Sequence, residues 1–73
     1  MDEQEVELAR IIADLGTASE IELQARTLKS VKNLREELKR MEQHGLVKRR
    51  PGFFKGGYGV AVELTPEGYK SVK

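Results

Sequence analysis

Apolar side chains near the start of the chain recur at intervals of three and four positions. This spacing gathers side chains on one face of an α-helix. It predicts a helix over about residues 3–15, which Gly16 ends in a left-handed conformation that costs glycine little. Acidic residues at its start complement the positive end of the helix dipole. The expected inward residues are Leu8, Ile11, Ile12 and Leu15.

A second helix is predicted after a short break at residues 17–19. Ser19 and Glu22 match the S-x-x-E capping box, in which each side chain bonds the other's free backbone N–H. The face expected in the core carries Ile21, Ala25 and Leu28. Leu23 lies off this stripe, where it either covers the first helix or contacts a partner.

The third predicted helix has the strongest pattern in the chain. Ser30 is its expected N-cap, and His44 with Gly45 closes it at about residue 44. A histidine in the last turn lies favourably at the negative end of the helix dipole, so we interpret His44 as a helix-terminal residue and not as a catalyst. The expected buried stripe contains Val31, Leu34, Leu38 and Met41.

The second half of the chain predicts a β-hairpin and a short last helix. Residues 60–64 alternate in the period of a half-buried strand, and Leu46 with Val47 opens an earlier extended stretch. Between them, Pro51 and four glycines predict a flexible hairpin tip. Thr65 and Pro66 begin the last helix, which Gly68 is expected to break or shorten. The fold class is mainly α with a small β-hairpin, in the order α-α-α-β-β-α.

Charge is segregated along the chain, although the formal net charge is only +1. Residues 1–25 hold seven acids and one base, whereas residues 26–55 hold ten bases and three acids. One basic side with an acidic back favours oriented docking on a polyanion over indiscriminate coating of nucleic acid. A solvated surface is the simpler alternative for a small chain in which 34% of residues are charged.

Composition excludes several classes of protein. Seventy-three residues, of which 38% are apolar, predict one small domain over residues 1–73 without a deep cavity between domains. The absence of cysteine excludes disulfides and thiolate metal sites, and His44 alone cannot form a histidine cluster. No pair of titratable residues is placed for acid–base catalysis. We therefore expect no enzyme activity, no metal and no cofactor.

The sequence also gives an expected location. No run approaches the roughly 20 apolar residues that cross a bilayer, and the acidic opening lacks the features of a signal peptide. We therefore expect a cytoplasmic protein that makes no membrane contact.

Two stretches resemble MarR-like and ArsR-like transcription regulators. Residues 17–50, TASEIELQARTLKSVKNLREELKRMEQHGLVKRR, are similar to a capped helix followed by a recognition helix that ends in L-x-x-M/L-x-x-x-G-L-V-x-R. Residues 58–72, YGVAVELTPEGYKSV, resemble a wing strand followed by L-T-x-x-G. The resemblance covers about Leu8 to Tyr69 and implies a winged helix-turn-helix, with a three-helix core and a two-stranded wing. It also implies a small transcription regulator that binds double-stranded DNA with sequence selectivity.

Under this interpretation, the third helix enters the major groove. Its outward face should carry Lys32, Glu36, Lys39, Arg40 and Gln43, with Asn33 at the margin. Asn33 suits adenine N6 and N7, and Ser30 with the helix N-terminus suits a phosphate. Alternatively, Glu36 pairs with Lys32 and Arg40 in an ordinary solvated helix. The wing, about residues 48–60, would follow the backbone or enter the minor groove. The candidate contact residues are Lys29, Ser30, Lys32, Asn33, Arg35, Lys39, Arg40, Arg49, Arg50 and Lys55.

The sequence is also compatible with partners other than DNA. If the protein is a regulator, we expect a two-fold homodimer through the first and last helices, reading half-sites about one helical turn apart. The same basic surface would also suit structured RNA. A third alternative is a protein partner that contacts Leu23, Phe53 or Phe54, although one of the two phenylalanines is expected to cover the core.

Overall fold

The computed structural model describes residues 3–54 and 57–72. Three helices, α1 (Glu3–Leu15), α2 (Glu20–Thr27) and α3 (Val31–Gln43), precede a hairpin of β2 (Val47–Phe54) and β3 (Gly57–Leu64). A short strand, β1 (Thr17–Ser19), follows α1, and α4 (Pro66–Ser71) ends the described chain. The mainly α fold with a β-hairpin is confirmed.

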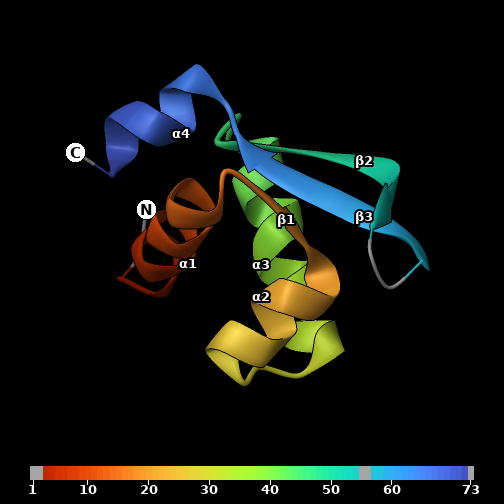
Figure 1. Ribbon diagram of the computed structural model, residues 1–73. Coiled ribbons are helices and arrows are strands. Elements are labelled where there is room, and N and C mark those ends of the chain that lie inside the picture. The colour runs from red at the N-terminus through yellow and green to blue at the C-terminus, as the bar shows by residue number, and fades with distance from the viewer. Residues whose placement is uncertain (1–2, 55–56, 73) are drawn as a thin grey trace.

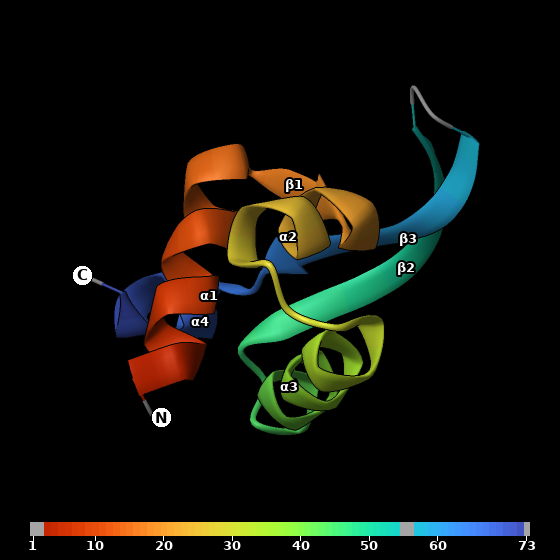
Figure 2. The same ribbon diagram turned by 90° about the horizontal axis from the view of Figure 1, so that it is seen from below.

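The elements surround one apolar core. Figure 1 shows α1 and α4 together at one end of the molecule, with the β2–β3 hairpin extending away from them. α3 lies along β2, and α2 lies near β1 and β3 (Figure 2). The core draws on all of these elements except α4, and it contains Leu8, Ala9, Ile12, Ala18, Leu23, Leu34, Leu38, Met41, Leu46, Val47, Val62 and Leu64.

Local capping residues fix the helix ends where the sequence predicts them. Gly16 and Gly45 adopt φ angles of +80° and +74°, which glycine tolerates best. The Glu22 N–H donates to Ser19 Oγ at 3.1 Å, and the Ser19 N–H donates to the Glu22 carboxylate at 3.2 Å. Thr65 caps α4, with proline in the first turn. These interactions span three or four residues, so the sequence reveals them directly.

The predicted break at residues 17–19 is a strand. β1 pairs antiparallel with β3 to give a sheet of order β1-β3-β2. Ala18 lies opposite Val62, and both side chains are buried. Three residues are too few for a visible alternation, so the sequence pattern missed this strand.

The predicted core face of α2 is wrong. Leu23 is fully buried, whereas Ile21 and Leu28 are 74% and 89% exposed and Ala25 is exposed as well. The inward face of this eight-residue helix also contains the half-buried, polar Thr27, whose Oγ1 donates to the Leu23 carbonyl at 2.7 Å. Because the other inward position of α2 is polar, the apolar pattern did not predict that Leu23 is buried. Because Leu23 is in the core, it is not an exposed anchor for a partner.

α3 buries Leu34, Leu38 and Met41 as expected, but not Val31. Val31 is exposed because the first turn of α3 extends beyond the core. Glu37 takes the fourth buried position instead. Helical spacing alone did not identify this residue, because an acid is rarely buried without a partner.

The glycine-rich stretch belongs largely to the hairpin ladder. Pairing continues from Val47 opposite Leu64 to Phe54 opposite Gly57, so Gly52 and Gly59 face each other within the strands. The flexible tip predicted for residues 51–59 is therefore mostly regular sheet. Phe53 is 86% exposed and does not close the core, while the side chains of Phe54 and Tyr58 lie outside the described residues.

The junction between α3 and the wing is tied to α4. Thr65 Oγ1 donates to the Gly45 carbonyl, and the Thr65 N–H donates to the Leu46 carbonyl at 3.0 Å. Gly68 is buried inside α4, and a Cβ atom there would overlap the Leu46 carbonyl oxygen. Gly68 therefore allows α4 to pack closely, whereas the sequence predicted that it would break or shorten the helix. These contacts fix the start of the wing relative to the end of α3.

Candidate nucleic-acid interface

The outward face of α3 presents an exposed polar surface. The helix buries its opposite side, so a 100° turn per residue directs Lys32 and Lys39 away from the core. Among the described residues, neither lysine has an ion-pair partner. We call this surface the α3 outer face and define it as Lys32, Asn33, Glu36, Lys39 and Gln43, all of which are exposed.

The N-terminus of α3 lies at one end of this face. Ser30 Oγ accepts a hydrogen bond from the Asn33 N–H at 3.2 Å, as its predicted capping role requires. The remaining N–H groups of the first turn carry the positive end of the helix dipole. This end of α3 therefore favours a phosphate oxygen without any rearrangement of the chain.

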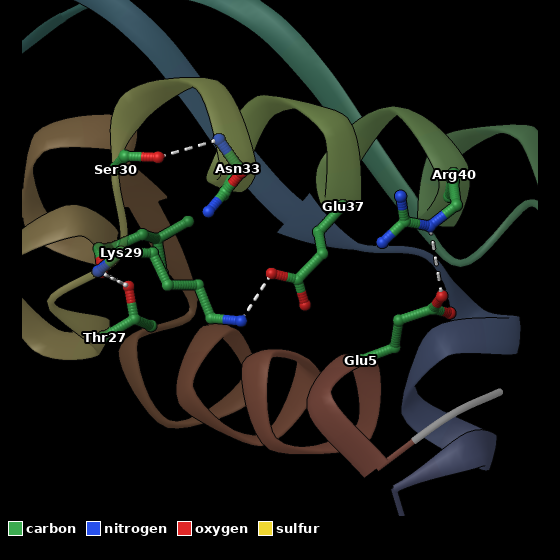
Figure 3. A network of polar contacts seen from close by, with 8 residues as sticks. Glu5, Thr27, Lys29, Ser30, Asn33, Glu37 and Arg40 are labelled. Atoms are coloured by element: carbon green, nitrogen blue, oxygen red, sulfur yellow. Dashed lines mark hydrogen bonds and ion pairs between the residues drawn. The ribbon is translucent and has the colours of Figure 1, made fainter.

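Lys29 joins the α2–α3 turn to the buried side of α3. Its Nζ lies 2.5 Å from Oε2 of Glu37, whose side chain is only 4% exposed. Figure 3 shows this pair on the side of α3 that faces α1, with the ion pair of Arg40 and Glu5 farther along the same side. Lys29 therefore supports the position of α3, although the sequence assigned it to nucleic-acid contact.

Arg40 also has a structural partner. Its Nε lies 3.6 Å from Oε1 of Glu5 in α1, while the Arg40 side chain stays half-exposed. Glu36 makes no ion pair within residues 3–54 and 57–72. The alternative in which Glu36 neutralises Lys32 and Arg40 is therefore wrong for this structure, because Arg40 turns toward α1.

A second group of candidate residues meets on the other side of α3. Arg35, Arg49 and Arg50 border a shallow cavity of about 370 Å³ together with Glu20, Pro51 and Val60. Arg35 donates to Glu20 Oε1 from two nitrogens, each at 3.3 Å. Nη2 of Arg50 lies 3.7 Å from Oε2 of Glu63, and most of the Arg50 side chain is exposed to solvent. The fold thus brings one arginine of α3 beside two of the wing.

Arg49 is held against α3 by a bidentate contact. Its Nη2 and Nε donate to the two carboxylate oxygens of Glu42 at 2.9 and 3.3 Å. These hydrogen bonds lower the pKa of Glu42 below its ordinary value of 4.5 and raise the pKa of Arg49. The pair orients the first part of the wing relative to α3 and leaves Arg49 only a quarter exposed.

The candidate residues outside the α3 outer face lie on its two flanks. On the α1 side, Lys29, Ser30 and Arg40 border a cavity of about 490 Å³ together with Asn33 of the outer face. Arg35, Arg49 and Arg50 lie on the wing side. Lys55 lies outside the described residues. Leu28, which the apolar pattern assigned to the core, is exposed and also borders the 490 Å³ cavity. Its left-handed backbone conformation leaves no trace in the spacing of apolar residues, so the pattern could not predict this position.

No protein-family model matches the chain, and no curated protein matches it in sequence. Solved structures do match. A single-residue mutant of MarR from E. coli, in complex with operator DNA, superposes with a TM-score of 0.89 and is 22% identical in sequence, and the alignment covers 99% of this chain and 51% of that one. The reduced form of E. coli MarR has a TM-score of 0.89 and 23% sequence identity, and the alignment covers 99% of this chain and 52% of that one. This chain has the MarR-type winged helix-turn-helix fold.

A third match extends the comparison to another organism. A protein from Enterococcus faecalis V583, described as a transcriptional regulator of the MarR family, has a TM-score of 0.79 and 30% identity. The alignment covers 94% of the winged helix and 62% of that protein. The winged helix thus spans about half the length of the MarR chains that it matches. The resemblance read from the sequence is confirmed at the level of the fold.

Two further properties concern the described residues alone. No helix among them is long and apolar enough to cross a membrane. Within residues 3–54 and 57–72, no group of three or more histidine, aspartate or glutamate side chains is arranged to hold a metal ion.

Proposed function

We propose that this winged helix binds double-stranded DNA with sequence selectivity, as the DNA-reading part of a transcription regulator. α3 enters the major groove, and the wing follows the backbone or the minor groove. The observation that carries the proposal is the α3 outer face, where Lys32 and Lys39 project unpaired beside Asn33. The fold match to a MarR protein that was solved with operator DNA supports it.

The α3 outer face suits a base edge better than a featureless polyanion. Asn33 can offer an amide donor and an acceptor to adenine N7 and N6, while the two lysines suit guanine acceptors or phosphates. Glu36 lies on the same face and would accept from cytosine N4. An exposed surface that mixes amide, ammonium and carboxylate groups supports discrimination among sequences.

We infer one domain over residues 1–73, without enzymatic activity, in the cytoplasm. A two-fold homodimer is part of the proposal, because one recognition helix reads only one half-site. α1 and α4 lie together at one end of the molecule, and the β2–β3 hairpin extends away from them (Figure 1), so an interface there would leave α3 exposed.

Fluorescence anisotropy tests the proposal with three probes: pooled random duplex DNA, a structured RNA hairpin and a labelled neutral polymer. Each is titrated with the full chain from low to physiological salt. The proposal predicts binding to the duplex, with log affinity falling linearly with log salt concentration. Tighter binding to the RNA would replace it with an RNA-binding function. No salt-dependent binding to either nucleic acid would overturn it in favour of a protein partner.

A further inference from the structure

Leu28 combines two unfavourable features. It adopts φ 59° and ψ 21°, the left-handed region, and it is the one non-glycine residue with a positive φ among those described. This conformation places Cβ close to the following carbonyl, so glycine or asparagine usually occupies it. The side chain is also 89% exposed, which leaves a large apolar group in water. Neither feature stabilises the folded chain.

The turn holds Leu28 firmly in this conformation. Its N–H donates to the Gln24 carbonyl at 2.9 Å, which ends α2. On the other side, the ion pair between Lys29 and Glu37 fastens the turn to α3. Figure 3 shows Lys29 and Thr27 in this turn, where the Lys29 N–H donates to Thr27 Oγ1 at 3.4 Å. The leucine is therefore presented outward by a fixed backbone.

The cavity beside Leu28 is otherwise lined by polar residues. Leu28 borders the 490 Å³ cavity at the N-terminal end of α3, and the other lining residues are polar or charged. They include Ser30, which caps α3, and Asn33, which belongs to the α3 outer face. This surface suits phosphates and base edges. A ligand that binds there would cover the exposed leucine favourably only if it also carries an apolar group.

The major groove of DNA displays one such group. Among the edges that the four base pairs present there, only thymine carries a methyl group, at C5. We propose that Leu28 contacts the 5-methyl group of a thymine and so contributes to sequence selectivity. This inference rests on the proposed function, and it adds a residue in the turn to the outer face of the recognition helix. Such a contact would offset the cost of a leucine at a position where glycine would relieve the backbone strain.

The test removes the methyl group from DNA and the side chain from protein. On a duplex selected from a random pool, each thymine is replaced in turn by deoxyuridine, which lacks only the 5-methyl group. For the unmodified protein, one position is expected to lose about fourfold in affinity, as for burial of one methyl-sized group. With Leu28→Gly, the thymine and deoxyuridine duplexes should bind equally at that position.

Two controls keep the result interpretable. Ile21→Ala removes another exposed apolar side chain, from α2, and should preserve the fourfold ratio between the affinities for the thymine and deoxyuridine duplexes. Leu28→Gly should remain folded by circular dichroism and unfold at a higher temperature than the parent, because glycine tolerates the left-handed turn. Salt-dependent binding without any deoxyuridine-sensitive position would overturn the inference and leave the proposed function intact, as would a ratio that Leu28→Gly preserves. Failure to bind duplex DNA at all would overturn both.

Discussion

Lys29 Nζ lies 2.5 Å from Glu37 Oε2 and connects the α2–α3 turn to the buried side of α3. The other carboxylate oxygen, Oε1, is buried and accepts no hydrogen bond from the described residues. Lys29 is therefore the main compensation for a charge that has left water. The position of the proposed recognition helix depends on this pair.

Removal of the lysine should consequently destabilise the fold. We expect Lys29→Met to lower the free energy of unfolding by about 1 to 3 kcal/mol, because Glu37 would stay buried without its partner. The double variant Lys29→Met with Glu37→Leu should regain most of this loss. Urea unfolding of the single and double variants measures both values. Equal stability of Lys29→Met and the parent would show that solvent compensates Glu37 adequately.

Gly68 gives a second test, in the packing that fixes the wing. Gly68→Ala should lower the unfolding free energy by about 2 to 3 kcal/mol, because the new methyl group would overlap the Leu46 backbone. Glu67→Ala, at the neighbouring exposed position of α4, serves as the matched control and should change stability little. Thermal unfolding followed by circular dichroism compares the two. An unchanged melting temperature for Gly68→Ala would mean that α4 does not pack on Leu46.

Interactions that span a few residues were predictable from the sequence. The capping box of Ser19 and Glu22 and the glycine ends at Gly16 and Gly45 were predicted at the observed positions. The burial of Leu23 was not predicted, because the elements packed around a short helix determine which of its faces is buried. Gly68 was misread for a similar reason, since its role depends on Leu46, which is distant in sequence.

The candidate site was predictable in outline but not in detail. The helical period of the sequence correctly predicted that Lys32 and Lys39 face outward, because this direction depends only on the geometry of α3. It could not show that Lys29 and Arg40 pair with acids, since Glu37 and Glu5 reach them only in the folded chain. Charge along a sequence reveals where cations gather, whereas tertiary structure decides which of them are available to a ligand.

The contact between Arg49 and Glu42 predicts an acid-sensitive contribution to stability. The folded-state pKa of Glu42 lies below 4.5, so the contribution is present above about pH 4.5 and is lost as the pH falls through the lowered value. Its size should not exceed about 1 kcal/mol, because solvent still reaches both side chains, which are 25% and 41% exposed, and screens the pair. Glu42→Gln should therefore be slightly less stable than the parent at pH 7, and the difference should shrink as the pH falls below 4.5. A deficit that persists at low pH would exclude this ion pair as its cause.

The unpaired lysines of α3 should dominate the salt dependence of binding. We expect Lys32→Ala and Lys39→Ala each to reduce the slope of log affinity against log salt by up to about 1, through loss of one phosphate contact. Lys70→Ala is the matched control, because it removes the same charge from α4, where Lys70 pairs with Glu67. Anisotropy titrations at several salt concentrations give the slopes. Equal reductions for all three variants would indicate a general charge effect and no defined face.

Dimethyl sulfate footprinting tests most directly whether α3 enters the major groove. The reagent methylates guanine N7 in the major groove and adenine N3 in the minor groove, so one experiment on a duplex selected from a random pool reports on both. Because α3 is assigned to the major groove, bound protein should protect guanine N7 at a few adjacent positions, and Asn33→Ala with Lys32→Ala should reduce that protection. Saturating protein that leaves every guanine N7 as reactive as in free DNA would contradict the account.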